Sequence, residues 1–103
     1  MMDFLKSIFS SGPSADFKAL VEAGAVIVDV RTPGEFKQGH IKGSVNIPLD
    51  QIGTKIATLK SKNTPIITVC RSGNRSSAAA GILRNSGIEV YNGGAWDSLE
   101  ASL

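Results

Sequence analysis

Four β-branched residues at positions 66–69 lead directly into the only cysteine of the chain, Cys70. A polar loop follows, and an alanine-rich segment begins at Ser77. β-Branched residues favour strands and alanine favours helices. The sequence therefore predicts a buried strand, a tight loop and the start of a helix.

The loop from Cys70 to Arg75 has the composition of an anion-binding site. The first N–H groups of a helix have no partner within the helix, and the helix dipole adds partial positive charge at the same end. A loop that bends into this end turns its amides toward an anion. Gly73 permits backbone conformations that are closed to other residues, and the arginines add forked cationic donors. The predicted anion-binding residues are Arg71, Ser72, Gly73, Asn74, Arg75 and Ser76.

These surroundings predict that Cys70 is a nucleophile. A free thiol has a pKa near ~8.5, and electropositive surroundings lower it to about 3.5–7.5. The alternative interpretation is a small buried apolar side chain, because lone cysteines are usually buried. The two arginines after Cys70 favour the thiolate, which would attack an anionic substrate.

Short apolar segments alternate with segments of helical spacing along the chain. This alternation predicts an α/β domain with a mostly parallel sheet. Strands are expected at residues 25–28, 45–47, 66–69 and 88–91, and helices around residues 17–23, 32–36, 52–59, 77–85 and 95–99. Residues 92–94 are predicted to form a turn. Gly81 lies inside a predicted helix, where glycine costs about 1 kcal/mol relative to alanine, so we expect a packing reason for it.

Asp29 and Arg31 follow the first predicted strand, at the end where ligands gather in open α/β sheets. They either pair and hold the loop that follows, or form a surface ion pair worth about 0–1 kcal/mol. Thr32 and Glu35 have the spacing of a capping box, with proline at the first helical position.

His40 is the only histidine, and it is either a base for Cys70 or a structural residue. An anion-binding loop makes a separate base unnecessary, which favours the structural role. One cysteine and one histidine cannot complete a tetrahedral metal shell, so no metal is expected.

Length and charge restrict the remaining possibilities. The chain has 103 residues, enough for one domain, and its net charge of +2 gives no argument for nucleic acid or membrane binding. One cysteine fits a reducing compartment, so a cytoplasmic location is expected. We divide the chain into an N-terminal extension or short helix at residues 1–12 and a single domain at residues 13–103.

The N-terminal ten residues are a poor signal peptide, because Asp3 lies where positive charge is expected and Lys6 interrupts the apolar run. Their apolar residues share one helical face, which favours a small packing helix over a weak membrane or partner contact. These residues are Phe4, Leu5, Ile8 and Phe9.

Three motifs resemble the rhodanese family. Residues 70–76 resemble its active-site loop, residues 29–48 resemble its N-terminal signature, and residues 93–96 resemble its C-terminal glycine pair and tryptophan. The resemblance implies a sheet of about five strands with helices on both faces. It also implies that Asp29, Arg31 and His40 are structural.

The resemblance further implies sulfur transfer. The Cys70 thiolate would take a sulfane sulfur from a small anionic donor such as thiosulfate, form a persulfide, and pass the sulfur to cyanide, a thiol or a protein cysteine. No metal or organic cofactor would be needed. Arg71 and Arg75 would hold the sulfonate, although Arg75 could instead brace the loop.

Two alternatives remain. A cysteine-dependent phosphatase or arsenate reductase also uses an anion-binding loop. Enzymes of that kind place five residues between the cysteine and the arginine, whereas four residues separate Cys70 from Arg75. A persulfide relay or binding module for a protein partner is the other alternative.

Overall fold

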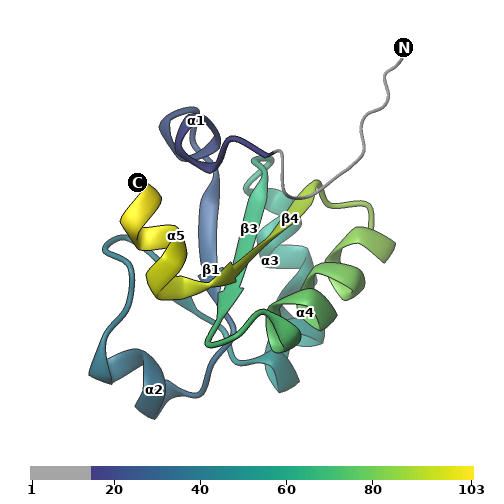
Figure 1. The fold of residues 1–103 in the computed structure, drawn as a ribbon. Coiled ribbons are helices and arrows are strands. Elements are labelled where there is room, and N and C mark those ends of the chain that lie inside the picture. The colour runs from purple at the N-terminus through teal and green to yellow at the C-terminus, as the bar shows by residue number, and fades with distance from the viewer. Residues whose placement is uncertain (1–14) are drawn as a thin grey trace.

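The computed structural model describes residues 15–103 (Figure 1). The expected N-terminal extension at residues 1–12, with its apolar face, lies outside the described residues. Four strands form one parallel sheet in the order β2-β1-β3-β4. The strands are β1 (Val26–Asp29), β2 (Val45–Asn46), β3 (Ile66–Cys70) and β4 (Val90–Ala95).

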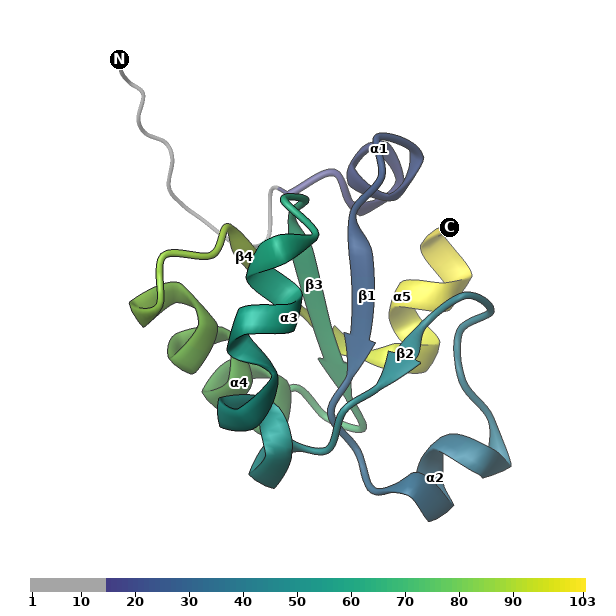
Figure 2. The same ribbon diagram turned by 180° about the vertical axis from the view of Figure 1, so that it is seen from behind.

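Helices cover both faces of this sheet, as expected (Figures 1 and 2). The α-helices are α1 (Phe17–Glu22), α2 (Pro33–Gln38), α3 (Ile56–Ser61), α4 (Asn74–Asn85) and α5 (Trp96–Ser102), and η2 (Leu49–Lys55) is a 3-10 helix. Seen from behind, α3 lies in front of the sheet, α4 lies to the left of β3, and α5 lies beyond the sheet (Figure 2).

Strand β3 is the centre of the core because it is buried on both faces. Ile66 and Cys70 pack with the helices η2, α3 and α4, whereas Ile67 and Val69 pack with α1 and α5. All five residues of β3 are buried. Continuous apolar sequence is what a parallel strand between two helical layers requires.

The sheet has four strands in residues 15–103, so the expectation of about five is wrong for this part of the chain. The fifth strand was implied only by the resemblance, since the sequence itself offers four strand-like segments. The other apolar stripe, at Ile52, Ile56 and Leu59, has helical spacing and packs one face of the sheet from η2 and α3.

Two local expectations are also wrong. Residues 92–94 continue β4 instead of forming a turn, and a bulge opposite Thr68 and Val69 accommodates Gly93. A Cβ on Gly93 would lie 2.8 Å from Ile67 Cγ2 and 3.0 Å from the Thr68 carbonyl oxygen, which explains the glycine. Gly81 has no such reason, because a Cβ there would meet nothing within 4 Å.

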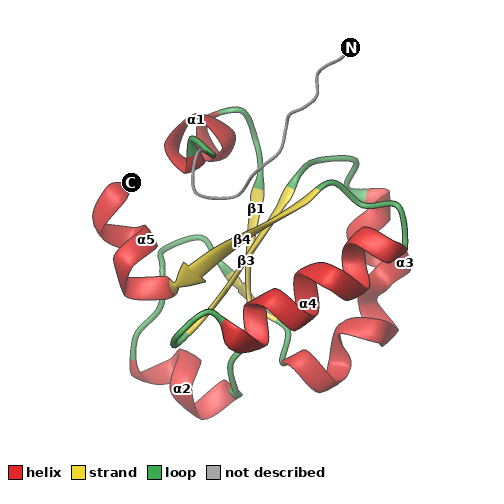
Figure 3. Cartoon of the chain, turned by 45° about the vertical axis from the view of Figure 1, so that its right-hand side comes forward, coloured by secondary structure: helices red, strands yellow, loops and turns green. Residues whose placement is uncertain are grey.

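The parallel strands all end at the same edge of the sheet. Helix α2 and the first turn of α4 lie at this edge (Figure 3). The expected capping box is present: the Thr32 hydroxyl accepts from the Glu35 N–H, and the Glu35 carboxylate accepts from the Thr32 N–H. This edge therefore brings together the loops after β1 and β3 and the start of α5, which follows β4 directly.

Candidate active site

The loop between β3 and α4 is built around a left-handed glycine. Gly73 is the N-cap of α4 and has φ of +104°. A side chain disfavours this conformation, so glycine is the residue that suits it. The turn brings the first amides of a 12-residue helix back toward the end of β3, as the sequence predicts.

The Cys70 sulfur faces these amides. Its side chain lies on the α4 face of the sheet, and the residue is only 1% exposed. Sγ accepts hydrogen bonds from the Gly73 N–H at 2.9 Å and the Ser76 N–H at 3.4 Å. Cys70 is thus both buried and directed at the start of α4, which combines the two interpretations of its sequence position.

Opposing effects act on the ionisation of this thiol. Burial is the largest and raises the pKa of Cys70, because a charged sulfur loses hydration. The Ser76 hydroxyl and the backbone N–H groups of Ser76, Gly73 and Ser72 lower it, and together they prevail. The net pKa of Cys70 lies below the ordinary thiol value, so these donors favour the thiolate.

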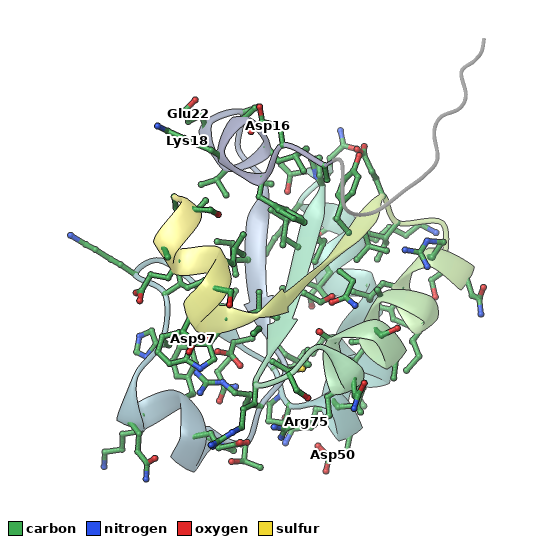
Figure 4. The ribbon with its side chains drawn as sticks, viewed as in Figure 1. Asp16, Lys18, Glu22, Asp50, Arg75 and Asp97 are labelled. Carbon is green, nitrogen blue, oxygen red and sulfur yellow. The ribbon has the colours of Figure 1, made fainter. Side chains whose placement is uncertain are left out.

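The two arginines of the loop have different surroundings. Both terminal nitrogens of Arg75 donate to the carboxylate of Glu35 on α2, at 2.8 and 3.0 Å. In Figure 4, Arg75 lies at the edge of the molecule where the strands end. Arg71 is exposed and makes no ion pair with any residue in 15–103.

An open cavity of about 380 Å³ lies beside the loop. It is lined by Arg31, Glu35, Gln38, Gly39, Arg71, Trp96 and Asp97. Figure 4 places Asp97 at the beginning of α5, on the same side of the molecule as α2. The cavity provides Arg71 as a cation and the indole of Trp96 as an apolar wall.

Ser72 and Asn74, the other predicted loop residues, are exposed. No hydrogen bond from either side chain reaches Cys70 in the described part of the chain, although the Ser72 N–H contributes to the lowered pKa of the thiol. Ser76 is completely buried, and its hydroxyl oxygen lies 3.4 Å from Sγ.

Asp29 and Arg31 form a buried ion pair. Both carboxylate oxygens of Asp29 accept from the guanidinium, the shortest contact being 2.7 Å, and the side chains are 0% and 5% exposed. Arg31 Nη2 also donates to the Gly39 carbonyl at 2.6 Å, and the guanidinium stacks on Trp96 with Cζ 4.7 Å from the ring centroid. The surface-pair alternative is therefore wrong.

His40 lies on the loop after α2 and is exposed. Its Nδ1 is 2.7 Å from the Phe36 carbonyl oxygen, and its ring stacks on Phe36 at a centroid distance of 3.7 Å. No hydrogen bond joins His40 to Cys70 among residues 15–103. The site therefore shows no contact through which His40 could act as its base.

Two asparagines that support the site were not recognised in the sequence. Asn46 Nδ2 on β2 donates to the carbonyls of Asp29 and Arg31, both at 3.0 Å. Asn92 on β4 accepts from the Ser76 hydroxyl at 2.7 Å. The only signal was a polar residue beside an apolar segment, which is too common to be specific.

A family model described as "Rhodanese-like domain" matches residues 14–97. The chain belongs to the rhodanese family.

Several relatives support this assignment. Thiosulfate sulfurtransferase GlpE of Stutzerimonas stutzeri is 39% identical over 85 residues, which cover 82% of this chain and 77% of GlpE. Thiosulfate sulfurtransferase PspE of Escherichia coli is 38% identical over 65% of this chain and 66% of PspE. An uncharacterized protein, YqhL of Bacillus subtilis, is 41% identical over 66% of this chain but only 54% of its own length.

Solved rhodanese structures have the same fold. A structure described as a rhodanese with anions, from E. coli, is 34% identical, with a TM-score of 0.67 over 72% of this chain and 89% of that one. A rhodanese-related protein of Thermoplasma volcanium has a TM-score of 0.72 at 30% identity, over 82% of this chain and 83% of its own. The layered arrangement around the cysteine loop is thus that of the rhodanese family.

Within residues 15–103, no helix has the length and apolar character needed to cross a bilayer. In the same residues, no three histidine, cysteine or acidic side chains are grouped so as to hold a metal ion.

Proposed function

We propose that this chain is a sulfurtransferase that moves a sulfane sulfur from a small anionic donor to a thiophilic acceptor through Cys70. The observation that carries the proposal is the pair of N–H groups, from Gly73 and Ser76, that donate to the cysteine sulfur. The family's relatives named thiosulfate sulfurtransferase support sulfurtransferase activity in general.

The first half-reaction begins with the thiolate. Cys70 Sγ attacks the outer sulfur of thiosulfate and forms a new S–S bond, while the original S–S bond breaks and sulfite leaves with its electron pair. Cys70 then carries a persulfide anion. Amide donors fixed before the reaction stabilise this charge without reorganisation.

In the second half-reaction, an acceptor attacks the terminal sulfur of the persulfide. Cyanide leaves as thiocyanate, and a thiolate leaves as its own persulfide, while the electron pair of the broken S–S bond returns to Cys70. The enzyme alternates between two stable forms, so ping-pong kinetics are expected. Neither step requires a metal or an organic cofactor.

The arginines divide the remaining work. Arg71 is exposed and lines the cavity beside the loop, so we assign it the sulfonate of the donor. Arg75 uses both terminal nitrogens on Glu35, so we assign it the bracing of the loop against α2. Buried Asp29 and Arg31 support the loop after β1, and His40 packs on Phe36 from the loop after α2.

The decisive experiment measures the persulfide directly. Treatment with thiosulfate should make the protein one sulfur atom heavier by mass spectrometry, with the addition on Cys70, and cyanide should remove it. The Cys70→Ala variant should gain no sulfur and form no thiocyanate. Equal thiocyanate formation by the two proteins would overturn the proposal.

The same proteins separate the alternatives. A relay for a protein partner would acquire the persulfide but pass it slowly to cyanide and faster to a thiol. A phosphatase would hydrolyse an aryl phosphate and acquire no sulfur.

A further inference from the structure

The side chain of Asn92 connects β4 to the cysteine loop through three hydrogen bonds. Its Oδ1 accepts from the Ser76 hydroxyl at 2.7 Å and from the Gly94 N–H at 3.0 Å. Its Nδ2 donates to the Gly73 carbonyl at 3.3 Å. Asn92 therefore contacts both loop residues whose N–H groups reach the Cys70 sulfur.

These partners fix the orientation of the amide. If Oδ1 and Nδ2 were exchanged, the NH₂ group would face the Gly94 N–H, and the oxygen would face the Gly73 carbonyl. Both contacts would be repulsive. Asn92 Oδ1 is thus an acceptor, and the Ser76 hydroxyl is the donor in their contact.

Ser76 has only one hydroxyl proton for three neighbours. Its oxygen lies 2.7 Å from Asn92 Oδ1, 3.1 Å from the Gly73 carbonyl oxygen and 3.4 Å from Cys70 Sγ. In the neutral thiol, S–H donates to Ser76 Oγ while Ser76 donates to Asn92. When the thiol ionises, the sulfur becomes an acceptor and competes with Asn92 and the Gly73 carbonyl for the same proton.

We propose that Asn92 is a positioning residue that holds the Ser76 hydroxyl proton and thereby regulates how readily Cys70 ionises. Asn92 does not touch the sulfur and acts through Ser76. Regular pairing with Thr68 of β3 places Asn92 in the sheet, and the bulge at Gly93 comes directly after this pair. The inference rests on the proposed nucleophilic role of Cys70.

Two substitutions at this position should have opposite effects. Asn92→Asp keeps an acceptor for Ser76 and adds negative charge, so the proton is held more tightly and the thiol midpoint should rise by about 1 pH unit. Asn92→Ala removes the nearer of the two acceptors that compete with the sulfur and leaves only the Gly73 carbonyl, at 3.1 Å, so Ser76 donates more readily to the thiolate and the midpoint should fall by about 0.5 pH units. Both variants lose the hydrogen bond to the Gly73 carbonyl. If the role of Asn92 were purely structural, the thiol midpoint would therefore shift in the same direction in both variants.

The midpoint is measured from the pH dependence of alkylation by iodoacetamide. The chain has one cysteine, so the reaction reports Cys70 alone. Tyr91→Phe is the matched control, because it lies next to Asn92 on β4 and its hydroxyl bonds Glu89 instead of the loop. This control should leave the midpoint unchanged.

A second test asks whether the effect passes through Ser76. In a Ser76→Ala background, Asn92→Ala should cause no further shift of the midpoint. The inference is overturned if Asn92→Asp and Asn92→Ala shift the midpoint in the same direction or if neither shifts it. It is also overturned if Asn92→Ala still shifts the midpoint in the Ser76→Ala background. Asn92 is exposed, so its loss opens no core cavity, and Asn92→Leu replaces the Ala variant if that variant does not fold.

Alkylation needs no sulfur donor, so this test is independent of turnover. Opposite shifts in a protein that forms no persulfide would overturn the proposed function and leave the role of Asn92 intact. Normal sulfur transfer together with midpoint shifts in the same direction would overturn the role of Asn92 and leave the proposed function intact.

Discussion

The N–H groups that donate to the Cys70 sulfur come from Gly73 and from Ser76, in the first turn of the helix that Gly73 caps. Burial alone would raise the pKa of Cys70, whereas the Ser76 hydroxyl and the N–H groups of the loop together bring this pKa below the ordinary thiol value. Their effect depends on direction, since an N–H group rotated away from Sγ stabilises nothing. The left-handed conformation of Gly73 is therefore part of the chemistry as well as of the turn.

We predict that Gly73→Ala lowers both stability and reactivity. An alanine at φ of +104° is strained by about 1–2 kcal/mol, and relief of that strain turns the Gly73 N–H away from the sulfur. The thiol midpoint should rise, and persulfide formation at neutral pH should slow. Urea unfolding and the pH dependence of alkylation measure the two effects.

Gly81→Ala is the matched control for this prediction. It lies in α4, has no positive φ, and an added Cβ meets nothing within 4 Å. Alanine in a helix interior should stabilise the protein by up to about 1 kcal/mol, with no change in alkylation. A loss of stability at Gly81 equal to that at Gly73 would contradict the role assigned to backbone conformation.

Among the elements, β4 shows where sequence patterns stop being informative. Apolar periodicity identified Val90 and Tyr91 as strand, but asparagine and two glycines favour turns, so residues 92–94 were misassigned. What keeps them in the sheet is pairing with β3 and space for only a hydrogen at Gly93. Such pairing between distant segments is not visible in local sequence, and the contact between Asn92 and Ser76 depends on it.

The bulge predicts a large effect for a small change. In Gly93→Ala, the new methyl group would lie 3.0 Å from the backbone oxygen of Thr68, which cannot rotate away. We expect a loss of about 1–3 kcal/mol in unfolding free energy, as for overpacked cores. Gly53→Ala in η2 is the control, since nothing lies within 4 Å of its added Cβ. Equal urea midpoints for the two variants would contradict this prediction, because they would mean that β4 moves enough to accommodate the methyl group without loss of stability.

Helix α2 and the cysteine loop are joined by the ion pair between Glu35 and Arg75. Hydrogen bonding to Arg75, then to the Thr32 backbone, lowers the pKa of Glu35 to about 2. The carboxylate is therefore more acidic in the folded chain than in the unfolded chain. Its contribution to stability is present above pH ~4.3, the ordinary glutamate pKa, and is lost as the pH falls toward 2.

Glu35→Gln should lower stability at pH 7 by about 0.5–1 kcal/mol, because the pair is partly exposed. Glutamine keeps an acceptor for the capping box, so the interaction that is lost is the one between the negative charge and Arg75. The difference from the natural protein should vanish near pH 2 in urea titrations. Glu100→Gln is the control, since this exposed carboxylate on α5 makes no ion pair within residues 15–103. An undiminished difference at pH 2 would contradict an ionic origin.

For the whole molecule, local apolar patterns predicted the α/β class and placed the cysteine loop between a buried strand and a helix. The two helical layers were implied by the family resemblance. The partner of each charged side chain could not be predicted in the same way. The pairing of Arg75 with Glu35 joins residues 40 positions apart, and only the packed fold brings them together.

The buried pair of Asp29 and Arg31 affects the largest part of the structure. Arg31 links the end of β1 to the Gly39 carbonyl and to Trp96 at the start of α5. In Asp29→Asn the guanidinium stays buried without a counter-charge, a situation that costs about 3–5 kcal/mol. The free energy of unfolding of a domain of this size is about 5–15 kcal/mol in total, so we expect a clearly lower urea midpoint for the variant.

Asp50→Asn provides the comparison for this last prediction. Asp50 is exposed in η2 and makes no ion pair with the described residues, so its substitution should change stability by less than about 0.5 kcal/mol. If Asp29→Asn lowered the free energy of unfolding no more than this control does, the Arg31 guanidinium would have to be hydrated in the variant. The pair would then not be what holds the loop after β1 against α5.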